Sequence, residues 1–207
     1  MAVSQVSPGN FFIPELGKTI KITDVRQDAF FDTEEQVSGA ITSGSKLDIF
    51  KDLSNKNKHH TNLTNERRIP GRNKFNLLRV GVHVRQAWGN TIPSGSDTLK
   101  VYEAGALSFS INTRLVTEGP LLRYQSGYGV TGATTATDTS ILTLGTPSQV
   151  AAPKFIAAHP VDDTDDLACD IRFDHNTWMT TTTMPTLAAA SLISVFLDGI
   201  VEKPITT

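Results

Sequence analysis

Four aspartates that lie close together could supply the oxygen ligands of a cation site. They are Asp162, Asp163, Asp165 and Asp166, in the run HPVDDTDDLACD. Calcium prefers carboxylate and carbonyl oxygens, but the run lacks the central glycine and the terminal glutamate of an EF-hand loop. We therefore predict no metal site, and we keep calcium binding by these four aspartates as the alternative to a solvated, charged loop.

The histidines are the next candidates for metal or acid–base chemistry. His59 and His60 are adjacent, so on an extended backbone they point to opposite faces and cannot easily share one ion. His83 lies between Arg79 and Arg85, which is a poor environment for a cation. A cupin-type enzyme needs a His-x-His pair, and the stretch GVHVRQAWG has arginine where the second histidine would fall.

Motifs for nucleophilic or phosphate chemistry do not accompany these residues. The sequence has no Gly-x-Ser-x-Gly elbow, no phosphate loop and no His-Glu-x-x-His. Its single cysteine, Cys169, can form neither an internal disulfide nor a cysteine zinc site. We therefore predict no catalytic residue, no cofactor-binding residue and no enzyme activity, and an enzyme ranks third among the alternatives.

The charged residues are divided between two parts of the chain. Residues 46–85 contain ten lysines and arginines against three acids, and residues 162–174 contain six aspartates and one arginine. Complementary patches of this kind favour head-to-tail contacts between identical copies, although each could equally be a solvated face. The predicted inter-subunit contacts of these two parts are Arg67, Arg68, Arg72, Asp163 and Asp166.

The N-terminal segment has an apolar centre between turn-forming residues. Phe11, Phe12 and Ile13 are flanked by prolines and glycines in MAVSQVSPGNFFIPELG, which disfavours a helix. We predict an extended arm over residues 1–17 whose three apolar residues contact a neighbouring subunit. The alternative is a frayed chain end.

Length and composition fit one domain, which we place at residues 18–207. The 207 residues are enough to bury one substantial core. Hydrophobic residues at 39% and charged residues at 19% are typical of a globular chain, and the polar remainder, rich in threonine, serine, glycine and asparagine, favours strands and turns. A net charge of -2 gives no overall attraction to nucleic acid or anionic lipid. We expect neither a signal peptide nor a membrane-spanning segment.

Apolar alternation with a period of two residues predicts seven or eight strands. In NKFNLLRVGVHVR the even positions from Leu78 to Val84 are apolar, whereas the odd positions from Arg79 onward are arginine, glycine or histidine. Residues 106–116 show the cleanest alternation and are predicted as one strand. Residues 192–201 are apolar on both faces, as in a central strand. The predicted strands cover residues 19–26, 29–31, 46–50, 73–85, 106–116, 154–158, 167–173 and 192–201.

Long polar links and two short helix candidates separate these strands. Residues 54–72, 86–98 and 125–152 form the links, and such long loops often carry function. The helix candidates are residues 96–106, with Ser96 or Asp97 as N-cap, and residues 185–192. A barrel, a Greek-key sandwich and a jelly roll all fit. We expect an all-β fold, an eight-stranded antiparallel jelly roll with long loops and an extended N-terminal arm.

The segment GSKLDIFKDLSNKNKHHTNLTNERRIPGRNKFNLLRVGVHV, residues 44–84, carries a family resemblance. The segment resembles single jelly-roll capsid (coat) proteins of tailless icosahedral bacteriophages. The resemblance lies in a short strand that ends in phenylalanine, followed by a DLS turn, the stretch TNLT, and IPGRNKF before a long apolar strand. The likeness is detailed over about forty residues and loose elsewhere. The chain has room for one roll only.

The resemblance implies a structural virion protein that self-assembles into the capsid shell. Its partners would be copies of itself, other capsid or vertex proteins, and viral membrane or genome on the inner face. It implies no cofactor and no small-molecule substrate, and a location in the virion after synthesis in the host cytoplasm. The residues alone, through the absence of a catalytic constellation, the β-rich pattern and the apolar arm, lead to the expectation of a structural, self-assembling protein.

The alternative function is a carbohydrate- or receptor-binding β-sandwich, such as a spike or vertex protein. Aromatic side chains on its loops would stack on sugar rings. The candidates are Trp88, Tyr102, Tyr124, Tyr128 and Trp178.

Overall fold

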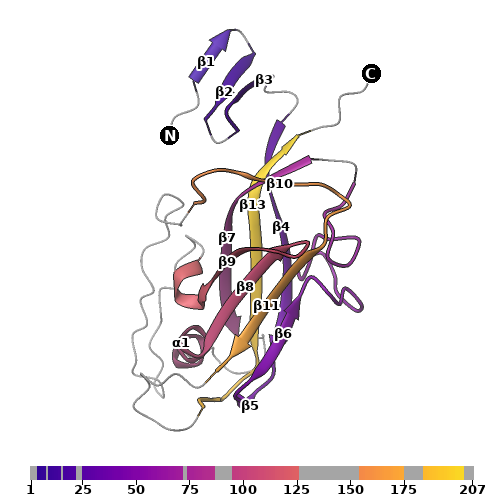
Figure 1. Cartoon of the computed structure of the whole chain (residues 1–207). Helices are drawn as coiled ribbons and strands as arrows, with labels where there is room; N and C mark the ends of the chain where they lie inside the picture. Colours follow the sequence, from indigo (N-terminus) through magenta and orange to yellow (C-terminus); the bar gives the residue numbers. More distant parts are fainter. Residues whose placement is uncertain are drawn as a thin grey trace.

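Two four-stranded antiparallel sheets dominate the computed structural model of the chain (Figure 1). The structure describes residues 4–7, 9–14, 16–21, 25–71, 74–86, 95–125, 154–174 and 184–202. The chain is mostly β and has two large antiparallel sheets, consistent with the expected all-β sandwich. Within the described ranges it has one α-helix, and no helix is long and apolar enough to cross a membrane.

The first sheet has the order β10-β7-β13-β4. Its strands are β10 (His159–Val161), β7 (Lys74–Gln86), β13 (Ser191–Glu202) and β4 (Val25–Gln36). β13 lies between β7 and β4 and pairs with both along its whole length. Ile193, Val195 and Leu197 point into the core and are buried, which confirms the central position predicted from the apolar character of residues 192–201.

A β-bulge changes the inward face along β7. Asp198 pairs with Arg79, but Gly199 pairs with Leu77, so Leu78 is the extra residue. Leu77 before the bulge and Val80 after it are therefore both buried, whereas Leu78 is only half-buried. The prediction that Leu78 shares one face with Val80 is wrong, because a bulge shifts the alternation by one residue. A Cβ on Gly199 would lie 2.2 Å from the Asn76 carbonyl oxygen, so the bulge requires glycine there.

The second sheet has the order β6-β11-β8-β9. Its strands are β6 (Ser45–Ile49), β11 (Leu167–Phe173), β8 (Gly105–Ile111) and β9 (Arg114–Pro120). Residues 106–116, predicted as one strand, are instead the hairpin β8–β9. Asn112 sits at its turn with φ 54°, a conformation that asparagine tolerates better than most residues. The alternation continues through the turn, so it could not reveal the break.

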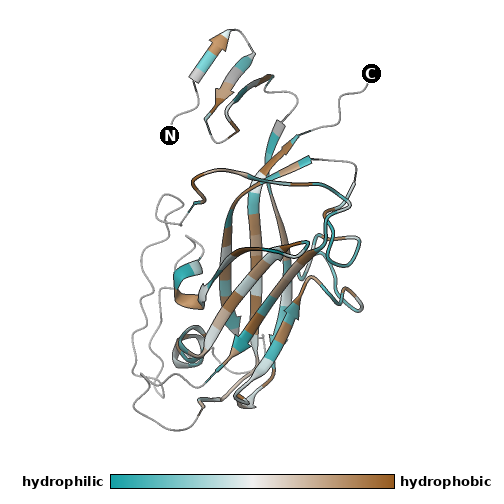
Figure 2. Ribbon diagram, in the orientation of Figure 1, coloured by the Kyte–Doolittle hydropathy of each residue, from teal (hydrophilic) through white to brown (hydrophobic). Residues whose placement is uncertain are grey.

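The apolar core lies between the two sheets. Alternating hydrophobic and hydrophilic residues along β8 and β11 are visible in Figure 2. Leu167, Cys169, Ile171 and Phe173 of β11 all face inward and are buried, as their alternation predicts. Phe30 of β4 meets Phe75 of β7 edge to face, with ring centroids 4.9 Å apart.

One helix candidate is confirmed and the other is wrong. α1 (Gly95–Ala104) occupies most of residues 96–106, but it begins before both predicted N-caps. Asp97 is buried in the first turn and accepts hydrogen bonds from the backbone N–H groups of Ala188 and Ala189, at 2.8 and 3.1 Å. Residues 185–192 contain β12 (Thr186–Leu187), which pairs with β5 (Gly39–Ala40), and the start of β13.

Short elements complete the described chain. β10 occupies residues 159–161, after the predicted 154–158, because Phe155 makes a single backbone bond to Leu78 and the chain then bends. The 3-10 helix η2 (Leu121–Tyr124) follows β9. The N-terminal strands are β1 (Ser4–Ser7), β2 (Asn10–Ile13) and β3 (Lys18–Lys21), in a separate three-stranded antiparallel sheet.

The difference in burial between two leucines on neighbouring strands predicts unequal effects of their substitution on stability. Leu107 of β8 is completely buried, and Leu115 of β9 is exposed. Leu107→Ala should lower the free energy of unfolding by about 2–5 kcal/mol because it leaves a cavity. Leu115→Ala should change it by less than about 0.5 kcal/mol. Urea denaturation of both variants checks this, and equal losses would contradict the inward orientation of Leu107.

Candidate functional site

The N-terminal segment is a small sheet rather than one extended arm. Its strands β1, β2 and β3 form two hairpins, and the second hairpin spans the expected boundary after residue 17. Phe12 is 36% exposed and Val6 is 62% exposed, whereas Ile13 is buried. A three-stranded sheet needs an apolar face packed against something, and this sheet leaves part of its apolar surface in solvent. The side chain of Phe11 lies outside the described part.

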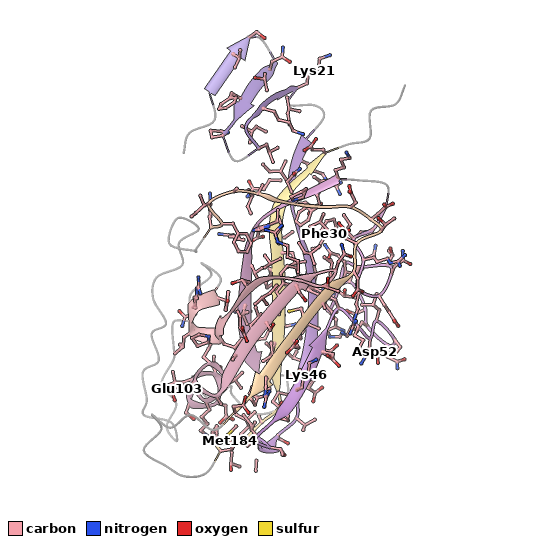
Figure 3. The ribbon with its side chains drawn as sticks, in the orientation of Figure 1. Lys21, Phe30, Lys46, Asp52, Glu103 and Met184 are labelled. Carbon is pink, nitrogen blue, oxygen red and sulfur yellow. The ribbon has the colours of Figure 1, made fainter. Side chains whose placement is uncertain are left out.

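An ion pair links this N-terminal sheet to the body. Lys18 Nζ lies 2.7 Å from Glu202 Oε2, and Asn76 Nδ2 donates to Glu202 Oε1 at 2.6 Å. The Lys18 side chain is about half exposed, and exposed pairs contribute only about 0–1 kcal/mol. Figure 3 shows the sheet and Lys21 standing away from the sandwich.

A groove separates the N-terminal sheet from the body beside β10. Its volume is about 400 Å³. Ile156 is fully exposed at its edge. Its lining combines the polar residues Lys18 and Asn76 with apolar ones, which are Pro14, Leu16, Ile156, Ala157, Ala158 and Pro160. This end of the molecule thus combines a weakly attached sheet with exposed apolar side chains.

The basic and acidic segments meet within one chain. The Arg67 guanidinium lies 3.7 Å from the Asp166 carboxylate. The Leu167 N–H donates to the Arg67 carbonyl oxygen at 2.8 Å, which fixes the backbones of the two segments beside each other. Arg67 and Asp166 were predicted to contact a second subunit, and here they are partners of each other. Arg68 is exposed, and Arg72 lies outside the described residues.

The four aspartates form a turn that is stabilised by hydrogen bonds. Asp165 Oδ2 accepts from the Asp162 N–H at 2.8 Å, and its Oδ1 accepts from Asn112 Nδ2 at 2.9 Å. The Asn112 Oδ1 accepts in return from the Asp166 N–H. Asp163 is half-buried. Both oxygens of Asp165 therefore bind protein donors, and nothing in this geometry favours the calcium alternative.

His83 and His159 both lie in environments that disfavour their charged forms. Burial lowers the pKa of His83, and the nearby Arg85 lowers it further. Burial and Arg114 likewise lower the pKa of His159, whose ring packs edge to face on Phe155. Burial raises the pKa of the Cys169 thiol well above its usual range, with smaller contributions from nearby aspartates. Among the described residues, no three His, Cys, Asp or Glu side chains form a group that could hold a metal.

Two of the proposed sugar-stacking aromatics are core residues. Tyr102 of α1 is buried, and its hydroxyl donates to the Val82 carbonyl oxygen at 3.1 Å and accepts from the Val84 N–H at 3.2 Å. Burial raises the pKa of Tyr102 to about 12. Tyr124 of η2 is also buried, with its hydroxyl 2.8 Å from the Thr117 hydroxyl. Their placement on exposed loops was wrong. Trp88, Tyr128 and Trp178 lie outside the described residues.

The long loop after β6 covers the edge of β4, which the sequence did not indicate. Asn62 Oδ1 accepts from the Phe31 N–H, and Asn62 Nδ2 donates to the Ala29 carbonyl oxygen, both at 2.8 Å. Thr61 pairs with Asp32 in a β-bridge. An open sheet edge is a template for unwanted strand pairing, so this loop shields part of the edge. The TNLT stretch is polar, which fits a loop but does not by itself predict this contact.

No protein-family model, curated protein or solved structure matches this chain.

Asn62→Ala should destabilise the β4 edge. Loss of both side-chain bonds leaves the Phe31 N–H and the Ala29 carbonyl without these partners, at a cost of about 1–3 kcal/mol. Urea unfolding and amide hydrogen exchange at Phe31 measure the effect. The matched control is Asn57→Ala, because Asn57 is exposed and its side chain accepts from His59 within the same loop. Equal exchange at Phe31 in both variants would contradict the proposed edge cover.

Proposed function

We propose that this chain is a self-assembling capsid subunit built on a jelly roll. Its eight main strands in chain order are β4, β6, β7, β8, β9, β10, β11 and β13. The first pairs with the eighth, the second with the seventh, the third with the sixth and the fourth with the fifth. This nested pairing supports a long hairpin wrapped into two sheets, as in the jelly rolls of capsid and lectin domains.

The N-terminal sheet is the observation that carries the assembly proposal. It lies outside the two main sheets, it exposes Val6 and Phe12, and its residues Pro14 and Leu16 line the groove beside the body. Large apolar surfaces rimmed by polar residues mark interaction sites. We infer that this sheet packs on a neighbouring copy and thereby completes a hydrophobic core that it lacks in the monomer.

The charged segments have a smaller part in this proposal than the sequence suggested. Because Arg67 and Asp166 pair internally, head-to-tail attraction would depend on residues such as Arg68 and Asp163. The proposed partners are copies of this chain, other capsid or vertex proteins, and viral membrane or genome on the inner face. The proposed role is structural, in the virion, with synthesis in the host cytoplasm and no enzyme activity.

A carbohydrate- or receptor-binding module is the second candidate. The lectin domains that share the jelly-roll architecture favour it. Burial of Tyr102 and Tyr124 removes two of its five proposed stacking residues. Binding of glycans by a protein that remains monomeric would favour this candidate over assembly.

Deletion of residues 1–21 should reduce particle formation and leave the sandwich folded. The deletion removes the whole N-terminal sheet together with the ion pair between Lys18 and Glu202. Negative-stain electron microscopy and light scattering would measure particles, and circular dichroism would measure the fold. Unchanged particles in the deletion variant would contradict the assigned role of the sheet.

A paired substitution tests the same surface without truncation. Val6→Ser combined with Phe12→Ser should weaken assembly, because both exposed side chains lose apolar area on the N-terminal sheet. The matched control is Val37→Ser combined with Leu122→Ser, which removes two exposed apolar side chains elsewhere on the molecule. Equal weakening by the two pairs, measured by analytical ultracentrifugation, would argue for general stickiness instead of a specific contact.

A further inference from the structure

A lysine and two carboxylates meet in a buried position at the inner side of β4. Lys56 Nζ lies 2.9 Å from each carboxylate oxygen of Asp32 and 2.5 Å from Glu34 Oε1. The Asp32 side chain is 0% exposed, that of Lys56 11% and that of Glu34 23%. Asp32 and Glu34 are two residues apart on a strand, so both point to the same face.

The backbone around Asp32 and Lys56 holds these two side chains against each other. The Phe50 N–H donates to Asp32 Oδ2 at 2.8 Å. Thr61 pairs with Asp32 in a β-bridge, and the Lys56 N–H bonds to the Leu53 carbonyl oxygen. Buried Phe50 and Leu63, at opposite ends of the loop, belong to the main core and anchor it there. Lys56 therefore reaches Asp32 from a loop that is tied down on both sides.

The environment of the cluster favours the neutral form of Glu34. Desolvation raises the pKa of Glu34 above its usual value and outweighs the lowering by Lys56, while the charge of Asp32 adds to the rise. Buried ions are costly even when paired, because their hydration is lost. Proton transfer from the lysine ammonium to a carboxylate yields an amine and a carboxylic acid. An amine of this kind is a nucleophile.

We propose that Lys56 and Asp32 are joined by an intramolecular amide bond, with Glu34 as the proton-transferring catalytic residue. The lone pair of the Lys56 amine forms a bond to Asp32 Cγ. Before the attack, Glu34 receives the ammonium proton of Lys56 and passes it to an oxygen of Asp32. As the carboxylate it then takes one proton from the attacking nitrogen and returns one to the departing hydroxyl group. The Cγ–O bond breaks, one water leaves, and Glu34 recovers its initial state. The amine and the carboxylic acid have become an amide, and no oxidant or cofactor takes part.

Three features of the cluster drive this condensation. Contact between the groups replaces a bimolecular encounter, and such proximity can correspond to effective molarities of about 10⁵–10⁸ M. The Phe50 N–H points at the oxygen on which negative charge develops, as a donor in an oxyanion hole does. The amide product also removes one buried positive and one buried negative charge.

The bond would fasten the long loop to β4 beside the edge that Asn62 covers. Residues 32–56 would become a closed covalent ring within a chain that has a single cysteine and hence no internal disulfide. Cross-links of this kind stabilise chiefly by restricting the unfolded chain. The proposal concerns one chain and does not depend on assembly into particles.

Intact-mass measurement of the denatured protein tests the proposal. The wild-type mass should be about 18 Da below the sequence mass, which is the loss of one water. Lys56→Arg should have its full sequence mass, because arginine cannot form this bond. N-terminal processing is common to both proteins and cancels in the comparison. A wild-type protein at its full mass would overturn the proposal.

Peptide mapping identifies the position of the bond. Trypsin should leave residues 27–46 joined to residues 52–58, since a modified Lys56 resists cleavage. Loss of water at Asp198-Gly199 by succinimide formation would give the same intact mass but no joined peptides, and finding only that product would refute the proposed bond.

Matched variants test the role of Glu34. Glu34→Gln should retain its full mass, whereas Glu35→Gln should lose one water like the wild type, because Glu35 is exposed on the opposite face of β4. Lys58→Arg, in an exposed part of the same loop, should also lose one water. Circular dichroism establishes that each variant is folded. Water loss in folded Glu34→Gln would overturn the catalytic assignment of Glu34.

Discussion

The pairing of β13 with β4 on one side and β7 on the other is the constraint on which the rest of the structure depends. Twelve residues of β13 pair with each neighbour, so the end of the chain is fixed against segments near its beginning and middle. Buried backbone groups must find hydrogen-bond partners, and this strand finds them on both edges. Its inward side chains then supply one wall of the core, and the hairpin β8–β9 with β11 and β6 supplies the other.

Polar side chains position the segments that surround this core. Asn62 makes hydrogen bonds to the open backbone edge of β4, and Asp97 of α1 accepts a hydrogen bond from the segment before β13. Asp32 accepts a hydrogen bond from the Phe50 N–H and forms an ion pair with Lys56. Each is a buried or half-buried group whose bonding capacity is used. A buried ion pair does not by itself stabilise a fold, so the Lys56 cluster is better understood through its geometry and chemistry than as a contribution to stability.

The N-terminal sheet differs from the body in its packing and in its attachment. The body has a continuous buried apolar core, although Val37, Leu115, Leu122 and Ile156 are exposed, and it shields part of one sheet edge with its own loop. The N-terminal sheet exposes Val6 and Phe12, and it is linked to the body by an exposed ion pair. A well-packed body with an incompletely packed terminal sheet is the arrangement expected of a subunit whose terminal sheet packs on neighbouring subunits. This contrast is the basis of the proposed function.

The sequence alone determined the β class, the central place of residues 192–201 and the inward face of β11, because each follows from local periodicity. It also indicated a helix over residues 96–106 from the N-cap signal of Ser96 or Asp97, although the helix begins at Gly95. Only the tertiary structure decided the bulge at Leu78, the hairpin turn at Asn112 and the internal pairing of Arg67 with Asp166. The meeting of Lys56 with Asp32 and Glu34 likewise appeared only in three dimensions. Registers and charge partners depend on which distant segments become neighbours, and a local pattern of residues does not encode that choice.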